Sequence, residues 1–261
     1  MGKIVSIHSF RGGTGKSNLT ANIATLFAQK GKRVGVIDTD IQSPGIHVIF
    51  QMDEEEIDRA LNDYLWGRCD IEDTAYDVSA KIGEGEIVLM SGGIYLIPSS
   101  IRAGEIARVL REGYDVGLLN KGFQTLIKKL ELDYLFIDTH PGLNEETLLS
   151  VAISDVLIII LRTDQQDFQG TAVTVDIARK LEVPHLQLVV NKAISSYNFD
   201  DLRQQVEENY GAPVVAILPL SEDMASMQSS DVFALKFPDH PVSEGIRGIV
   251  TAIESSLTDN H

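Results

Sequence analysis

The chain has 261 residues, 44% of them apolar and 7% aromatic, which is enough for one large α/β domain or two small ones. Its 22 lysines and arginines stand against 38 aspartates and glutamates, giving a formal charge of −16. Such a molecule repels nucleic-acid backbones and anionic lipid surfaces unless a local basic patch compensates. The lone cysteine, Cys69, cannot form an intramolecular disulfide, and no segment resembles a signal peptide or approaches the ~20 apolar residues of a membrane span. We therefore expect a cytoplasmic protein.

Short runs rich in Val, Ile and Leu alternate along the chain with longer segments of helical period. This alternation predicts a doubly wound α/β fold, a mostly parallel sheet with helices on both faces. The expected strands are 3–9, 33–38, 87–90, 95–97, 134–138, 156–161, 186–190 and 214–217. The expected helices are 16–30, 54–66, 104–112, 116–130, 145–154, 170–181, 199–210 and 243–256.

No internal repeat, low-complexity tract or linker interrupts the pattern, so we predict a single domain over residues 1–261. The helix expected at 16–30 carries an apolar stripe, and Gly31 supplies its stop. The acidic and least regular stretch, 53–86, is interpreted as an insertion, either a solvated flap or a partner surface.

A glycine-rich loop follows the first expected strand and precedes the first expected helix. It reads Arg11-Gly12-Gly13-Thr14-Gly15-Lys16-Ser17. Glycines let backbone N–H groups turn toward phosphate oxygens, and the helix presents its free N–H groups to the same anion. Lys16 is then expected at the β and γ phosphates and the Ser17 hydroxyl at Mg²⁺. The alternative is a glycine-rich turn without a ligand.

This loop departs from the general phosphate-loop pattern, which has glycine where the chain has Phe10. It resembles the deviant loop of ParA/MinD ATPases, in which a basic residue precedes Gly-Gly-x-Gly-Lys-Ser/Thr. The resemblance implies that Gly12 to Ser17 and the next residue, Asn18, bind ATP. In that family the leading residue is a lysine that touches the partner's nucleotide across a dimer. Arg11 stands there in this chain, and a solvated loop charge is the alternative for it.

Two expected strands end in aspartate, at Asp38 and Asp138, so both carboxylates emerge at the carboxyl edge of the sheet, where ligands bind. We expect Asp138 to hold Mg²⁺ through water, with Asp38 in support. The resemblance implies that Asp40 orients or activates the attacking water, and a helix cap is the alternative role. Gln42 matches the ParA pattern, whereas Gly45 replaces an asparagine that the family often has.

His140 follows Asp138 by two residues, at a position that senses the γ phosphate in the family. A packed loop histidine is an equal alternative. At the end of the strand expected at 186–190, the resemblance makes Asn191 the adenine contact, with a turn former as the alternative. Pro219 belongs to the loop that resembles the family's second base-flanking segment.

The C-terminal residues lack the basic amphipathic helix by which MinD proteins dock on membranes. Basic groups are scattered, so DNA binding is disfavoured and a protein partner fits best. The resemblance implies an ATP-dependent homodimer that hydrolyses Mg-ATP slowly and positions or partitions a cargo through a protein activator or adaptor. Two alternatives stay open: a nucleotide-dependent scaffold with little or no hydrolysis, and a metabolic ligase or kinase on the same fold.

Overall fold

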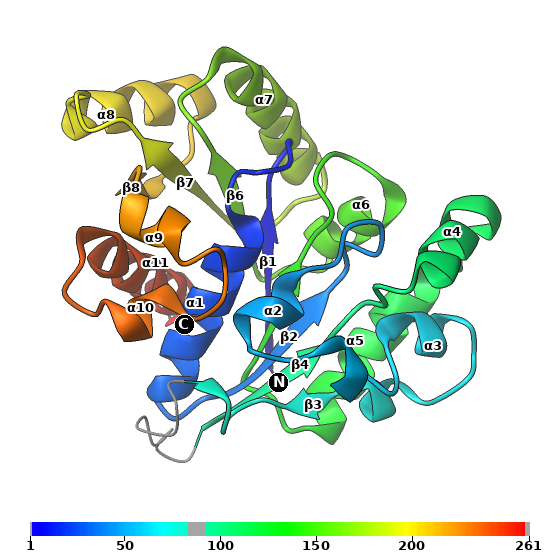
Figure 1. Cartoon of the computed structure of the whole chain (residues 1–261). Coiled ribbons are helices and arrows are strands. Elements are labelled where there is room, and N and C mark those ends of the chain that lie inside the picture. The colour runs from blue at the N-terminus through cyan, green and yellow to red at the C-terminus, as the bar shows by residue number, and fades with distance from the viewer. Residues whose placement is uncertain (1, 83–91, 259–261) are drawn as a thin grey trace.

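The computed structural model describes residues 2–82 and 92–258, and its strands form one eight-stranded sheet (Figure 1). Their order is β3-β4-β2-β5-β1-β6-β7-β8, with β1 near the centre. Neighbours are parallel except for β3, which pairs antiparallel with β4 at one edge. The strands are β1 (Lys3–His8), β2 (Arg33–Asp38), β3 (Tyr76–Asp77), β4 (Gly93–Ile97), β5 (Tyr134–Asp138), β6 (Val156–Leu161), β7 (His185–Ala193) and β8 (Val214–Pro219). The strand expected at 87–90 lies outside the described residues.

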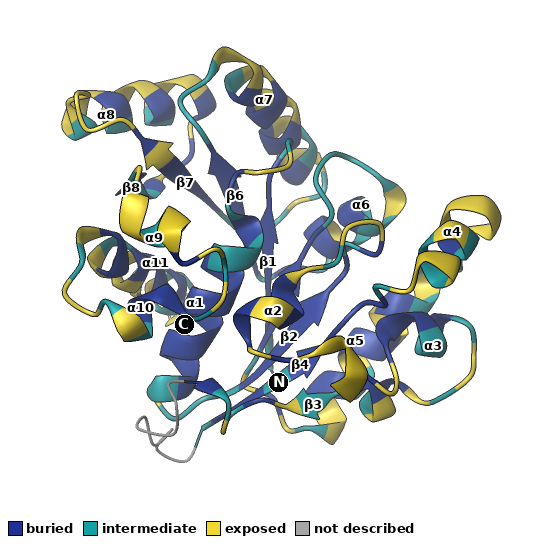
Figure 2. Cartoon of the chain, in the orientation of Figure 1, coloured by how far each residue is buried: buried dark blue, intermediate teal, exposed yellow. Residues whose placement is uncertain are grey.

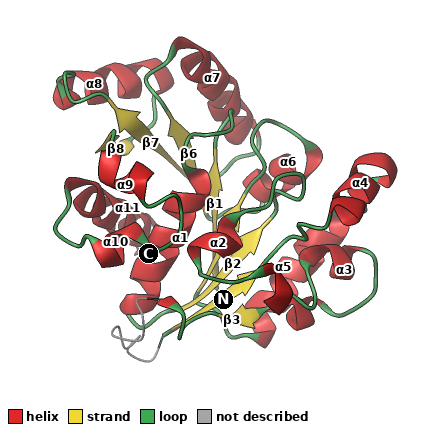
Figure 3. Ribbon diagram, viewed as in Figure 1, coloured by secondary structure: helices red, strands yellow, loops and turns green. Residues whose placement is uncertain are grey.

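Helices cover both faces of the sheet, which confirms the predicted fold class (Figure 3). The longer ones are α1 (Lys16–Gln29), α4 (Ala103–Glu112), α5 (Gly117–Lys129), α6 (Glu145–Ala152), α7 (Gln165–Lys180), α8 (Phe199–Tyr210) and α11 (Pro241–Thr258). The shorter ones are α2 (Ile46–Ile49), α3 (Leu61–Leu65), α9 (Glu222–Ser226) and α10 (Phe233–Lys236), with 3₁₀ turns at Glu54–Glu56 and Ile71–Thr74.

The strands are buried on both sides, as their continuous apolar runs require (Figure 2). Val5 and Ile7 of β1 belong to the apolar cluster that joins the sheet to α1 and α11. On the other face, α5 packs over β2 and β5, while α7 and α8 pack over β6 and β7. The apolar stripe expected on the first helix is buried, and Gly31 ends that helix with a left-handed φ of 83°.

The single helix expected at 54–66 is wrong, because the segment forms a 3₁₀ turn and then a separate helix, α3. Glu56 accepts a hydrogen bond from the backbone N–H of Asp53 and closes the first turn. The chain is extended at Ala60, whose N–H donates to the Asp63 carboxylate at 3.0 Å, so a new helix starts there. Two local caps therefore interrupt a pattern that looks continuous in the sequence.

The described part of the expected insertion packs onto the molecule and is not a free flap. Leu61, Leu65 and Ile71 are buried in the same apolar cluster as helix α5.

The start of α7 also differs from the prediction. This helix begins at Gln165, five residues before the expected start, because the Asp164 side chain accepts a hydrogen bond from the backbone N–H of Asp167 at 3.0 Å.

Candidate functional site

The glycine loop connects β1 to α1 above the carboxyl edge of the central strands (Figure 1). Gly13 and Gly15 have left-handed φ values of 76° and 95°, a conformation that side chains with a Cβ rarely adopt. Gly15 is also the residue before α1, and none of the described side chains caps the N–H groups that begin this helix. Uncapped backbone N–H groups thus lie at the place where the sequence predicted an anion-binding turn, and that role stays a prediction.

Lys16, Ser17 and Asp138 come together beneath this loop. Asp138 is 1% exposed and accepts a hydrogen bond from the Thr20 hydroxyl at 3.2 Å. Burial raises the pKa of Asp138 to about 6, while the Lys16 charge and the Ser17 and Thr20 hydroxyls act in the opposite direction. The predicted pair of magnesium-site residues, Ser17 and Asp138, is thus brought together.

Asp38 lies beside Asp138, as predicted, because the two residues are register partners on β2 and β5. Its carboxylate is 1% exposed and accepts from the backbone N–H groups of Asp40 at 3.0 Å and Gly45 at 3.2 Å. Burial, and then the nearby Asp138 and Asp40 charges, raise the pKa of Asp38 well above its ordinary value. Two adjacent buried carboxylates repel one another, so a cation between them would be stabilising.

The donor chemistry of this cluster fits Mg²⁺, since carboxylate and hydroxyl oxygens are hard ligands. Within residues 2–82 and 92–258, no set of three or more His, Cys, Asp or Glu side chains is arranged to hold a metal ion. Mg²⁺ in phosphate sites keeps several waters and phosphate oxygens as ligands and needs few from the protein. Ser17, Asp38 and Asp138 are the residues that would hold it.

Asp40 and His140 form a contact that the sequence did not predict. Their side chains are 15% and 21% exposed, and His140 Nδ1 lies 2.6 Å from Asp40 Oδ1. The same carboxylate oxygen accepts from the backbone N–H of Ser43 at 3.1 Å. The sequence shows only that each residue stands two positions after a strand-ending aspartate; the contact follows from the pairing of β2 with β5, which the structure reveals.

His8, at the end of β1, is a second histidine that sequence reasoning gave no role. Thr139 Oγ1 donates to the Ile7 carbonyl at 3.0 Å, so it accepts from His8 Nδ1 at 2.8 Å. His8 Nε2 then carries no proton and is buried without a partner among the described residues. Burial, followed by the Lys16 and His140 charges, lowers the pKa of His8 to about 3, so the ring is neutral.

Asn191 braces the loop from below. Its Nδ2 donates to the Thr14 carbonyl at 2.7 Å, and its Oδ1 accepts from the N–H of Lys192 at 2.9 Å. Lys192, which sequence reasoning assigned no role, donates from Nζ to the Gly13 carbonyl at 2.8 Å. The amide predicted to contact adenine is thus already engaged with backbone on both sides.

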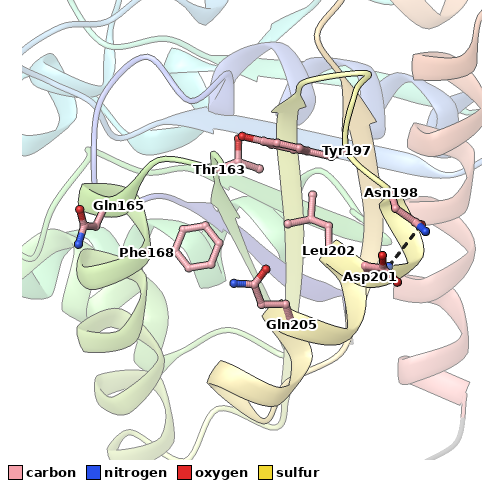
Figure 4. A pocket seen from close by; sticks show the side chains of 8 residues that line it. All are labelled: Thr163, Gln165, Phe168, Tyr197, Asn198, Asp201, Leu202 and Gln205. Carbon is pink, nitrogen blue, oxygen red and sulfur yellow. Dashed lines mark hydrogen bonds between the residues drawn. The ribbon is translucent and has the colours of Figure 1, made fainter.

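A cavity of about 250 Å³ opens beside this brace. It is lined by Gly15, Asn18, Asn191, Pro219 and Ser221, together with residues of α9. Four residues expected at the nucleotide, Gly15, Asn18, Asn191 and Pro219, therefore meet around this cavity. A separate open hollow of about 570 Å³ lies between α7 and α8, with Phe168 and Tyr197 in its wall (Figure 4). None of the residues predicted to bind nucleotide or metal lines that second hollow.

Arg11 lies near two carboxylates of its own chain, with its side chain partly exposed. Its guanidinium lies 3.5 Å from Asp164 and 3.9 Å from Asp167 at the start of α7. Arg162 shares both carboxylates, at 3.1 Å and 2.7 Å. The Arg11 side chain is still 42% exposed, so a solvated loop charge stays open as its role, and Asp167, only 2% exposed, is an acidic neighbour that the sequence alone did not reveal.

A glycine loop between a central strand and a helix, with aspartates at the end of the neighbouring strands, defines the class of P-loop NTPases. Within the described residues, no helix is both long enough and apolar enough to cross a membrane.

Comparison with known proteins narrows that class. Residues 1–254 match the family described as ParA, NUBPL iron-transfer P-loop NTPase, and the chain belongs to this family. It is 24% identical over 250 residues to an uncharacterised ATP-binding protein of Methanocaldococcus jannaschii, covering 95% of this chain and 86% of the relative. It is 28% identical over 233 residues to an iron–sulfur cluster carrier protein of Clostridium perfringens, covering 85% and 77%.

The fold is similar to that of solved MinD proteins. The septum site-determining protein MinD of Pyrococcus horikoshii, solved with Mg-ADP, superposes with a TM-score of 0.77 at 18% identity, over 97% of this chain and 96% of that one. The resemblance to ParA/MinD ATPases inferred from the loop is thereby confirmed at the level of family and fold.

Proposed function

We propose that the protein is a cytoplasmic, ATP-switched dimer that binds Mg-ATP at residues 11–17, hydrolyses it slowly and acts on a cargo through a protein partner. The observation that carries this proposal is the junction of β1 and α1. There, two glycines with left-handed backbone precede Lys16, the first residue of α1. The adjacent carboxylates of Asp38 and Asp138 lie at the ends of β2 and β5. Backbone N–H groups and one ammonium can bind phosphate oxygens, while the carboxylates can hold the metal.

ATP binding can be tested by titration calorimetry with Mg-ATP. Lys16→Ala should weaken ATP binding by tenfold or more, because the variant lacks the ammonium group that compensates the negative charge of the ATP phosphates. Lys180→Ala, which removes an exposed lysine at the end of α7, serves as the matched control and should bind as wild type does. Equal affinity of the Lys16 variant and wild type would refute the assignment of the loop.

A measurement of ATP hydrolysis distinguishes the proposed ATP-switched dimer from a nucleotide-dependent scaffold with little or no hydrolysis. Asp40→Ala should retain ATP binding and lose turnover, since it removes a group that positions water rather than a phosphate contact. Phosphate release by wild type, measured with and without candidate partners, decides between the two: a protein that binds ATP tightly and never releases phosphate is the scaffold.

Dimerisation depends in this proposal on Arg11, whose guanidinium can engage two phosphate oxygens at once. To reach a partner's nucleotide it must leave Asp164 and Asp167. Sedimentation with a slowly hydrolysed ATP analogue should show a wild-type dimer and a weaker dimer for Arg11→Ala, with nucleotide affinity of the monomer largely kept. Arg11→Lys should retain part of the dimer. A wild type that stays monomeric, or an Arg11→Ala dimer of equal strength, would contradict the trans contact.

Iron–sulfur carriage, the role named for some relatives, does not fit the residues of this chain. Such clusters are held by cysteine thiolates, commonly four. The 261 residues contain only Cys69, so a homodimer would supply two, and burial raises the pKa of that thiol. Anaerobic incubation with ferrous iron and sulfide should leave the purified protein colourless. A bound cluster that is lost in Cys69→Ser would overturn this conclusion.

The acidic charge disfavours direct contact with DNA or membranes. Binding to either DNA or anionic vesicles at about 0.15 M salt should be weak, because screening leaves scattered basic groups little attraction. Retention of the ATP-bound protein on either surface would redirect the search for its partner.

A further inference from the structure

The contact between His140 and Asp40 joins two loops that stand side by side above the candidate metal site. Asp40 follows β2 and His140 follows β5, and these strands are paired with Asp38 opposite Asp138. The side chains are 100 positions apart in sequence and 2.6 Å apart in space. The His140 carbonyl also accepts from the Thr147 hydroxyl of α6 at 3.2 Å, which holds the backbone of the histidine in place.

The chemistry of the contact fixes which nitrogen does what. An ionised carboxylate can only accept hydrogen bonds, so His140 Nδ1 carries the proton and donates it to Asp40 Oδ1. That oxygen also accepts from the Ser43 N–H at 3.1 Å. The two donors on Oδ1 restrict the rotation of the carboxylate, while Oδ2 can accept from another group.

We propose that His140 is a positioning residue: it holds the Asp40 carboxylate so that its second oxygen faces the water that attacks ATP. The inference rests on the proposed hydrolysis of ATP and on the role of Asp40 in it. It differs from a direct contact between His140 and the γ phosphate, because here His140 acts through its Nδ1 on the Asp40 carboxylate. A group misplaced by about 1 Å can cost a hundredfold in rate.

Two substitutions of His140 distinguish the role of its Nδ1 from that of its Nε2. His140→Asn keeps an N–H donor attached to Cγ, where Nδ1 stands, and removes the far side of the ring. His140→Gln places its amide farther out, near the position of Nε2, and loses the donor to Asp40. We expect His140→Ala and His140→Gln to lower kcat by roughly 10- to 100-fold and His140→Asn to recover most of it. The Kd for a slowly hydrolysed ATP analogue should stay within about threefold of wild type in all three.

The hydrogen bond between His140 and Asp40 can be detected without measuring ATP turnover. In nucleotide-free protein labelled with ¹⁵N-histidine, the His140 signal should show a protonated Nδ1, and Asp40→Ala should abolish that signature. His140→Ala introduced into Asp40→Asn should lower kcat no further, since the group that it positions has already been altered.

Opposite results would overturn the proposal. If His140→Gln works as wild type does while His140→Asn fails, the histidine acts through Nε2, as a phosphate contact would. If all three variants turn over at the wild-type rate, the contact positions nothing. A wild type that binds ATP without hydrolysing it would refute the proposed hydrolysis, whereas the nitrogen spectrum would still show whether His140 binds Asp40.

Discussion

Substitution of Gly15 by alanine tests whether the backbone of Gly15 and its contact with Asn191 stabilise the glycine loop. Its φ of 95° is left-handed, and a Cβ added there would lie 2.6 Å from Nδ2 of Asn191. The left-handed backbone costs a residue with a side chain about 1–2 kcal/mol. Moving Asn191 aside breaks its hydrogen bond to the Thr14 carbonyl, which costs about 1–2 kcal/mol more because both groups are buried. We expect Gly15→Ala to lower the free energy of unfolding by about 2–4 kcal/mol.

Gly13 provides the control, because its φ is also left-handed, at 76°, and an added Cβ would meet no atom of the described residues within 4 Å. Gly13→Ala should therefore lose only the backbone part, about 1–2 kcal/mol. Urea unfolding of nucleotide-free protein, followed by circular dichroism, measures both. In an Asn191→Ala background, Gly15→Ala should cost little more than Gly13→Ala does. If the two glycine variants are equally stable in the wild-type background, Asn191 does not brace the loop as described.

Two further predictions concern the surroundings of the loop. An added Cβ at Gly170 would lie 1.9 Å from the Phe10 ring, so Gly170→Ala should destabilise the fold by about 1–3 kcal/mol, whereas in a Phe10→Ala background it should be neutral or stabilising. Urea unfolding of the four proteins gives the coupling, and a cost independent of Phe10 would contradict the packing. The pKa of His8 is lowered by burial from 6.5 to about 3, so the folded state binds fewer protons than the unfolded state between these values and stability falls as the pH falls. From pH 7 to pH 5 this amounts to about 2 kcal/mol, which His8→Asn should remove while keeping a donor to Thr139; an unchanged pH dependence in that variant would refute the assignment.

Local patterns were sufficient to predict the frame of the molecule from its sequence. Apolar runs located seven of the eight described strands, and the glycine loop with its lysine defined the family, because these features depend on neighbours in the sequence. The edge strand β3 was missed, since two residues carry no periodic signal. The break before Ala60 was also missed, because it depends on a carboxylate cap that competes with an unbroken helical pattern.

The candidate site was predictable residue by residue but not contact by contact. Asp38 and Asp138 were expected at one sheet edge, and they are adjacent. Which charged group faces which could not be read from the chain, because it depends on strand order and on where helices begin. Arg11 meets Asp164 and Asp167 only because α7 starts beside the glycine loop, and His140 meets Asp40 only because β5 lies next to β2.

The strand order also governs when the loop can form during synthesis. β1 is made well before both of the strands that pair with it: Lys3 pairs with Tyr134, and Val5 pairs with Val156. At typical translation rates the N-terminal strand must wait roughly 8 to 30 s for the second of them. Until then its apolar residues have neither of these strands to pair with. The glycine loop therefore follows a fully paired strand only long after its own residues have been made.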